Sequence, residues 1–175
     1  GNVASTTQSN NTATLNDKVD ATIAGVLLAS DNGTIAVTMS EAVYNTNGGS
    51  GALEASDFYF AISGGSAGLS SSTPTSISAS GNVYTLGIGL SGTPNGRETL
   101  TVTPVENAIY DAIGNVAATS QSNNTAALND KTAPTIAGMS LASDNTTIAV
   151  IFSELVYNTN GGSGALAVSD FAFSI

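Results

Sequence analysis

Carboxylates are the side chains through which this chain could most readily do chemistry. The sequence has 13 Asp and Glu residues against three Lys and Arg, and it has neither His nor Cys. These absences remove the common general base, the thiol nucleophile, and the imidazole and thiolate ligands of transition metals. Oxygen ligands remain, and calcium takes roughly six to eight of them in irregular geometry. The composition therefore favours calcium binding over catalysis.

Hydrolysis by serine or by paired carboxylates is the remaining catalytic alternative. A serine nucleophile without His would need a lysine, and we expect Lys18 and Lys131 to lie in linkers. Two carboxylates can hydrolyse glycosides, but a sugar cleft usually also offers aromatic platforms, and the chain has no Trp. Because nucleophile, base and orienting group cannot all be assigned, we predict that the protein is not an enzyme.

The charge balance restricts the partners. A net charge of −10 argues against nucleic acid and against anionic membranes, because both need a basic surface. No apolar run approaches the roughly 20 residues of a membrane-spanning helix, so we expect no membrane insertion of this sequence.

The segments that would position the acids occur twice. Residues 1–62 and 114–175 are identical at 46 positions, with a constant offset of 113 residues. A fixed long period indicates a repeat. The sequence therefore divides into the last strand and linker of a preceding unit (1–18), a complete unit (19–131) and the first part of a following unit (132–175).

The complete unit shows the pattern of β-strands. Apolar and polar residues alternate over 34–39 and 82–90, as in half-buried strands, and Asp31 to Gly33 is a turn signal between two such runs. No window has an apolar period of 3.6 residues, so we predict an all-β fold. The expected strands cover residues 21–28, 34–39, 58–62, 77–79, 82–90, 98–104 and 119–128.

Four short motifs follow one another along this unit and into its second copy. They are Thr34 to Val43, Ser56 to Phe58 and Asp111 to Asn115, with Ala133 to Ile136 opening the second copy. In this order they resemble the bacterial immunoglobulin-like repeats of S-layer proteins and large surface adhesins. The first copy departs from the pattern, since Val19 to Thr22 lacks the proline of the second copy.

The resemblance implies tandem immunoglobulin-like β-sandwiches with about seven strands per unit. It also implies an extracellular position on a bacterial cell surface and a role as a structural spacer in a long surface protein. Some repeats of this type bind calcium between domains. The partners implied are the neighbouring repeats of the same chain.

In an immunoglobulin-like topology, strand direction decides which acids can meet. The second and sixth strands both end where the linker from a preceding unit arrives. Acids crowded there would repel one another, and a bound calcium ion would relieve the repulsion and stiffen the junction. The predicted calcium ligands are Asp17, Glu41, Asp57, Asp111 and Asn115 at the first junction, with Asp130, Glu154 and Asp170 at the next.

Each of these residues also has an ordinary structural explanation. Asp57 and Asp170 could cap turns, Asp111 to Asn115 could form a turn with Gly in a left-handed conformation, and Glu41 could bond backbone amides. The remaining glutamates of the unit are expected to be solvated. They are Glu54, Glu98 and Glu106.

Two other functions stay open. The Gly-rich stretch from Gly48 to Gly51 could be the tip of a module that binds a glycan or another surface. Residues 132–175 lack the strands that would cover their core, so we expect them to be stable only with a partner or with further sequence. In a self-assembling filament, this part would accept a strand from another copy of the chain.

Overall fold

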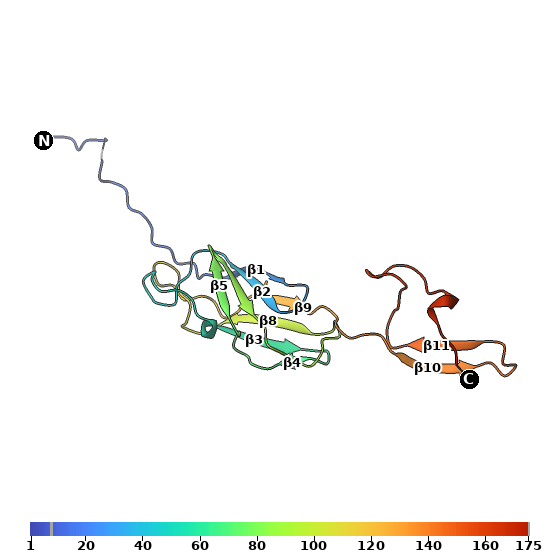
Figure 1. Cartoon of the computed structure of the whole chain (residues 1–175). Helices are drawn as coiled ribbons and strands as arrows, with labels where there is room; N and C mark the ends of the chain where they lie inside the picture. The colour runs from blue at the N-terminus through green and yellow to red at the C-terminus, as the bar shows by residue number, and fades with distance from the viewer. Residues whose placement is uncertain (8, 175) are drawn as a thin grey trace. The chain divides into compact units, whose positions relative to one another are not determined.

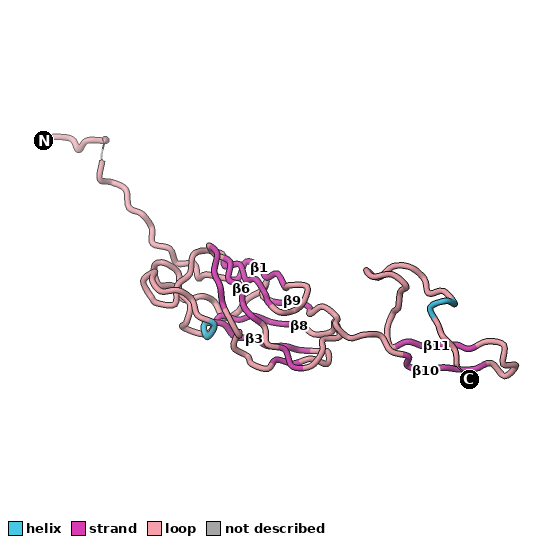
Figure 2. The backbone as a smooth tube through the Cα atoms, viewed as in Figure 1, coloured by secondary structure: helices cyan, strands magenta, loops and turns pink. Residues whose placement is uncertain are grey.

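The computed structural model describes residues 1–7 and 9–174. Within them it contains eleven β-strands and two short 3₁₀ helices (Figure 1), so the all-β prediction is confirmed. The chain separates into two compact units, one from Gly1 to Asp130 and one that begins at Lys131. The described residues ahead of the first strand form loop only (Figure 2).

Three antiparallel sheets make up the first unit. The largest has the order β1-β2-β6-β5, from strands Ile23–Leu28, Thr34–Met39, Val83–Gly87 and Ile77–Ser80. The second has the order β3-β8-β9, from strands Phe58–Ser63, Thr99–Pro104 and Thr125–Ala127. A small third sheet pairs β4 (Gly68–Leu69) with β7 (Leu90–Ser91).

Apolar side chains from the two larger sheets share one core. Every second residue of β2 points inward, and so does every second residue of β8, as the period of a strand requires. Each fully buried side chain of this size contributes about 1.5–3 kcal/mol to stability. The buried set includes Ile35, Val37, Phe58, Phe60, Leu86, Leu100 and Val102.

The first hairpin forms where the turn signal predicted it. β1 and β2 pair in antiparallel register from Ile23↔Met39 to Leu28↔Ile35. In the turn, Asp31 accepts the N–H of Gly33 at 2.8 Å, and Asn32 adopts a left-handed φ of 62°. Asparagine tolerates this conformation better than most residues, which explains its place in the turn.

Two expected strands differ from the structure by more than two residues. The run 82–90 divides into β6 and β7, which belong to different sheets, because Gly87 and Gly89 let the backbone pass close to Thr75 and Ser70 and leave the ladder. The run 119–128 is strand only over β9, since β8 offers partners to just three of its residues.

The second unit repeats the first hairpin. β10 (Ile136–Leu141) and β11 (Ile148–Phe152) pair in the register of β1 and β2, with a bulge at the equivalent place. A 3₁₀ helix at Val168–Asp170 matches the one at Ala55–Asp57. The segment 171–174, expected to be a strand, carries no strand assignment, because no described residue pairs with it as β8 pairs with β3.

Across the described residues, the structure has no helix with the length and apolar character that crossing a lipid bilayer demands.

Candidate metal centre

Three of the predicted ligands meet beside the start of the first unit. Asp17, Glu41 and Asp111 each place one carboxylate oxygen so that the three oxygens lie within 4.8 Å of one another. Asp17 precedes β1, Glu41 follows β2 and Asp111 follows β8. The segment before β1 and the segments after β2 and β8 thus bring acids from distant parts of the sequence to one place.

Asp111 is the fixed member of this group. It is buried, and its Oδ1 accepts the backbone N–H groups of Ile113, Gly114 and Asn115 at 2.9, 2.6 and 2.8 Å. Burial raises the pKa of this carboxyl, but the hydrogen bonds from Asn115, Ile113 and Gly114 outweigh burial and leave the pKa below its usual value. Asp111 is therefore a carboxylate at neutral pH, and its Oδ1 is already satisfied by the turn.

Asn115 ties the incoming linker to this turn. Its Nδ2 donates to Asp111 Oδ2 at 2.8 Å and lies 3.4 Å from the carbonyl oxygen of Asp17 and 3.5 Å from that of Val19. Asp17 in turn accepts the N–H of Val19 at 2.9 Å. Asn115 Nδ2 thus connects the Asp111 carboxylate to two backbone carbonyls of the linker.

Within this group, Glu41 is the acid whose pKa is raised. Desolvation raises the pKa of its carboxyl first, and the negative charges of Asp111 and Asp17 raise it further. The described residues include no backbone amide that donates to the Glu41 carboxylate. The structural alternative for Glu41, in which it would bond backbone amides, is therefore not observed. The three acids repel one another without a cation between them.

The Gly-rich loop packs against the turn that holds Asp111. Tyr44 and Tyr110 exchange two backbone hydrogen bonds of 2.7 and 2.8 Å at the base of the loop. Further along, a Cβ on Gly49 would come 2.8 Å from the carbonyl oxygen of Ala112, and a Cβ on Gly114 would collide with Asn47. Glycine at these positions lets the two loops approach closely, so the Gly-rich loop helps to hold the turn of Asp111 in place.

Asp57 lies outside this group. Its Oδ2 accepts the N–H of Glu54 at 2.7 Å and caps the first 3₁₀ helix. Burial raises the pKa of Asp57, and this hydrogen bond offsets part of the increase. Asp170 repeats the arrangement with the N–H of Ala167 at 2.8 Å. Asp57 and Asp170 thus both make the capping contact that was the structural alternative to calcium binding.

Asp130 and Glu154 are the remaining ligands predicted for the second junction. Asp130 ends the first unit, whereas Glu154 follows β11 in the second. Among the described residues, the only group of three acids with converging oxygens is Asp17, Glu41 and Asp111. The second junction therefore stays a prediction.

The expectation for Glu98 is wrong. This side chain is fully buried, and its carboxylate accepts the N–H groups of Ser66 at 2.7 Å, Ala67 at 3.0 Å and Asn95 at 3.1 Å. Burial raises its pKa, but these donors together lower it to about 2. The signal in the sequence was Gly64-Gly65, a turn that leaves successive N–H groups pointing at one place.

No family model, curated protein or solved structure matches this chain. The resemblance to bacterial immunoglobulin-like repeats therefore stays an expectation, and the functional argument depends on the residues of the chain itself.

Proposed function

We propose that the chain is a structural spacer of a bacterial surface protein, built from tandem immunoglobulin-like units whose junctions calcium stiffens. The observation that supports this most is that Asp17 of the linker lies with Glu41 and Asp111 of the folded unit, within 4.8 Å. A cation held by all three would connect the linker to the unit. An extracellular position, as the resemblance implies, would supply that cation.

The donor set fits calcium. It consists only of oxygens: three carboxylates and, beside Asn115, the carbonyls of Asp17 and Val19. Asp111 would contribute Oδ2, which accepts one hydrogen bond, from Asn115 Nδ2, whereas its Oδ1 accepts three backbone N–H groups. Calcium accepts such mixed carboxylate and carbonyl sets, whereas the absence of His and Cys disfavours zinc and copper.

The arrangement of the first unit supports a spacer role. Its two larger antiparallel sheets share one core, as the layers of an immunoglobulin-like sandwich do. A strand of six residues spans about 20 Å, so each unit would add a few nanometres to a rod. The Gly-rich loop packs on the acidic turn, which favours a role at the junction over ligand recognition.

The repetition supports a tandem array. Residues 1–62 and 114–175 share 46 identities, and the two hairpins have equivalent registers and bulges. In an array, a neighbouring repeat of the same chain is the partner of each junction.

Calorimetric titration of calcium into the full chain tests the proposal. We expect saturable binding that Asp17→Asn and Glu41→Gln each weaken by roughly tenfold or more, since each removes a carboxylate ligand. Glu106→Gln is the matched control, because Glu106 is exposed and outside the group. Heat signals that are absent, or equally reduced in all three variants, would refute the calcium site.

A second measurement tests stiffening. The chain has no Cys, so a spin label on Thr12→Cys reports the mobility of the linker alone. Calcium should slow the label, and Glu41→Gln should abolish that effect. Binding without slowing would leave a calcium site but contradict its role in the junction.

A further inference from the structure

Asn-Gly dipeptides occur at four places in the chain, and asparagine in this context can lose ammonia without an enzyme. The backbone nitrogen of the glycine attacks Cγ of the asparagine and closes a five-membered succinimide ring, while Nδ2 leaves as ammonia with the proton of the glycine N–H. Water then opens the ring at either carbonyl, which leaves aspartate or isoaspartate. Glycine favours the attack because no Cβ crowds its nitrogen. The four sites are Asn32–Gly33, Asn47–Gly48, Asn95–Gly96 and Asn160–Gly161.

The structure holds both reacting groups of Asn32–Gly33. The side chain of Asn32 is 1% exposed, and its Oδ1 and Nδ2 both bond to the backbone of Asn129. The attacking nitrogen is occupied as well, because the N–H of Gly33 donates to Asp31 Oδ1 at 2.8 Å. The first unit must therefore open locally before Asn32 can react.

Asn95 is also held, although by fewer contacts. Its Oδ1 accepts the N–H of Arg97 at 3.3 Å, and its own N–H donates to the buried carboxylate of Glu98 at 3.1 Å. Rotation of the Asn95 side chain towards Gly96 would break the first of these bonds. We therefore expect the folded chain to slow the reaction at Asn95.

Asn47–Gly48 has none of these restraints. Both residues are exposed in the Gly-rich loop. Within residues 1–7 and 9–174, neither the side chain of Asn47 nor the N–H of Gly48 makes a hydrogen bond. Nothing lies within 4 Å of a Cβ added to Gly48, so the attacking nitrogen has open space around it.

The same dipeptide lies against the turn that holds Asp111. Asn47 Oδ1 is so close to Gly114 that a Cβ there would collide with it, and the N–H of Gly114 donates to Asp111 Oδ1 at 2.6 Å. On the other side of Gly48, Gly49 packs on Ala112. A carboxylate at position 47 would thus be added beside an acid that is already ionised.

We propose that Asn47–Gly48 deamidates spontaneously and selectively in the folded chain, which adds a negative charge to the Gly-rich loop where it packs on the turn of Asp111. The new carboxylate repels that of Asp111 and loosens the contact between loop and turn. Because the ammonia is lost, the change is one-way and accumulates with the age of the molecule. The reaction needs only water as co-reactant and does not depend on calcium.

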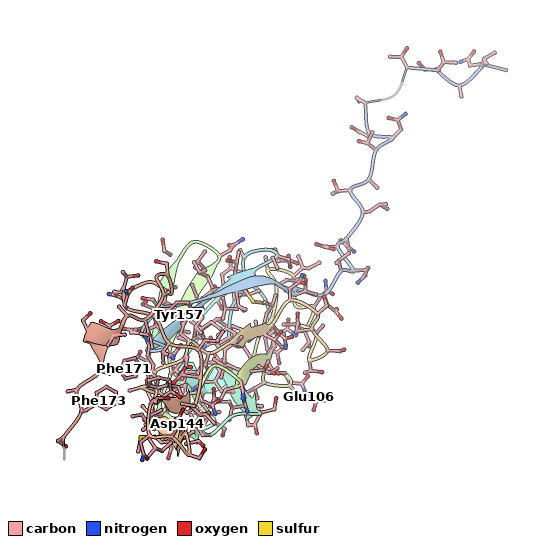
Figure 3. All side chains as sticks on the ribbon, turned by 90° about the vertical axis from the view of Figure 1, so that its right-hand side faces the viewer. Glu106, Asp144, Tyr157, Phe171 and Phe173 are labelled. Atoms are coloured by element: carbon pink, nitrogen blue, oxygen red, sulfur yellow. The ribbon has the colours of Figure 1, made fainter. Side chains whose placement is uncertain are left out.

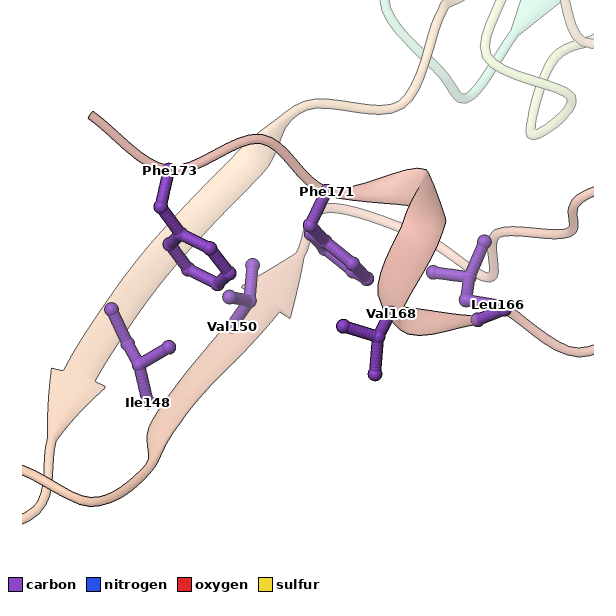
Figure 4. Close-up of a pocket in the computed structure, with 7 residues that line it drawn as sticks. Ile148, Val150, Leu166, Val168, Phe171 and Phe173 are labelled. Carbon is purple, nitrogen blue, oxygen red and sulfur yellow. The ribbon is translucent and has the colours of Figure 1, made fainter.

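The second unit contains the same loop in other surroundings. Residues 156–166 repeat 43–53 unchanged. Tyr157, the counterpart of Tyr44, lies in the second unit (Figure 3) and is 46% exposed. At the end of the loop, Leu166 lines an open pocket (Figure 4), whereas its counterpart Leu53 is only 7% exposed. We expect Asn160 to react at least as fast as Asn47, since fewer contacts restrain its loop.

Peptide mapping by mass spectrometry tests the selectivity, after the full chain has aged in mildly alkaline buffer with chelator. Trypsin separates residues 19–97, which contain three of the sites, from residues 132–175, and fragmentation locates the deamidated asparagine. In the folded chain, Asn47 should react at least roughly tenfold faster than Asn32 and Asn95, because only those two require local opening. In urea the three rates should agree within about twofold, because unfolding removes the contacts.

Two results would overturn the proposal. One is an Asn47 that survives in the folded chain although it converts in urea. The other is an Asn32 or Asn95 that reacts as fast as Asn47 in the folded chain.

Hydrogen exchange tests the effect of the new charge, with Asn47→Asp as a stand-in for the aged protein. Tyr44 and Tyr110 bond to each other through their backbone amides at the base of the loop. In low-salt buffer with chelator, both amides should exchange at least about threefold faster in the variant, and added salt should reduce this difference. Asn160→Asp is the matched control, because it adds the same charge to the second unit and should leave both amides unchanged. Equal exchange in the two variants would contradict the effect on the turn.

Discussion

Asn32 exchanges two hydrogen bonds with the backbone of Asn129, which lies 97 residues later in the chain. Its Oδ1 accepts the N–H of Asn129 at 2.9 Å, and its Nδ2 donates to the carbonyl oxygen of Asn129 at 2.8 Å. Asn32 is 1% exposed. The pair therefore joins the first hairpin to the last segment of the unit.

Asn32→Ala should destabilise the first unit by about 1–2 kcal/mol, because it removes two part-buried hydrogen bonds to the backbone of Asn129. Hydrogen exchange of the β2 amides measures this loss, and exchange of the β11 amides measures the loss in the control. Asn145→Ala is the matched control, since Asn145 has a similar left-handed φ of 59° but is exposed. Similar losses in the two variants would show that backbone strain, and not the contact with Asn129, explains the effect.

Glu98 should make the stability of the first unit fall in acid. Its folded pKa of about 2 lies below the ordinary value of 4.5, so the stability that ionised Glu98 contributes is complete above pH 4.5 and is lost as the pH falls towards 2. Glu98→Gln should lower stability at neutral pH and flatten the pH dependence in this window. Urea unfolding at several pH values checks both effects. An unchanged slope in the variant would mean that other carboxyls cause the acid sensitivity.

Glu41 should have opposite effects with and without calcium. Its pKa is raised, so its contribution to stability is present below the ordinary pKa of 4.5 and is lost as the pH rises through the folded pKa. In chelator at neutral pH, Glu41→Gln should therefore raise the melting temperature. Calcium should raise the melting temperature of the unmodified chain, and it should not raise that of the variant. Thermal melts under both conditions would contradict this if the variant melted lower in each.

Gly49→Ala should push the Gly-rich loop away from the turn that holds Asp111. Gly49 has a φ of 76°, and an added Cβ would meet the backbone carbonyl of Ala112 at 2.8 Å. Gly48→Ala is the control, because its φ is 104° but nothing lies within 4 Å of an added Cβ. Both variants carry backbone strain of about 1 kcal/mol, and we expect at least about 1 kcal/mol more for Gly49→Ala from the clash. Equal losses of unfolding free energy would show that the two loops separate easily.

Local patterns were enough to predict part of this structure. The alternation in Thr34–Met39 and the turn at Asp31 to Gly33 depend on neighbouring residues only, and both formed as expected. The meeting of Asp17, Glu41 and Asp111 also followed from the sequence, but only with an assumed topology that told which strand ends coincide.

The sequence by itself determined the all-β class, the 113-residue offset and the absence of His and Cys as metal ligands, because each depends on residue type or short-range order. Tertiary structure decided the rest. Glu98 is buried because N–H groups some thirty residues away converge on it, and Asp57 caps a turn while Asp111 joins the acidic group. Residues 171–174 contain the same Phe-x-Phe as β3 without forming a strand, because a strand requires a partner that its own residues do not supply.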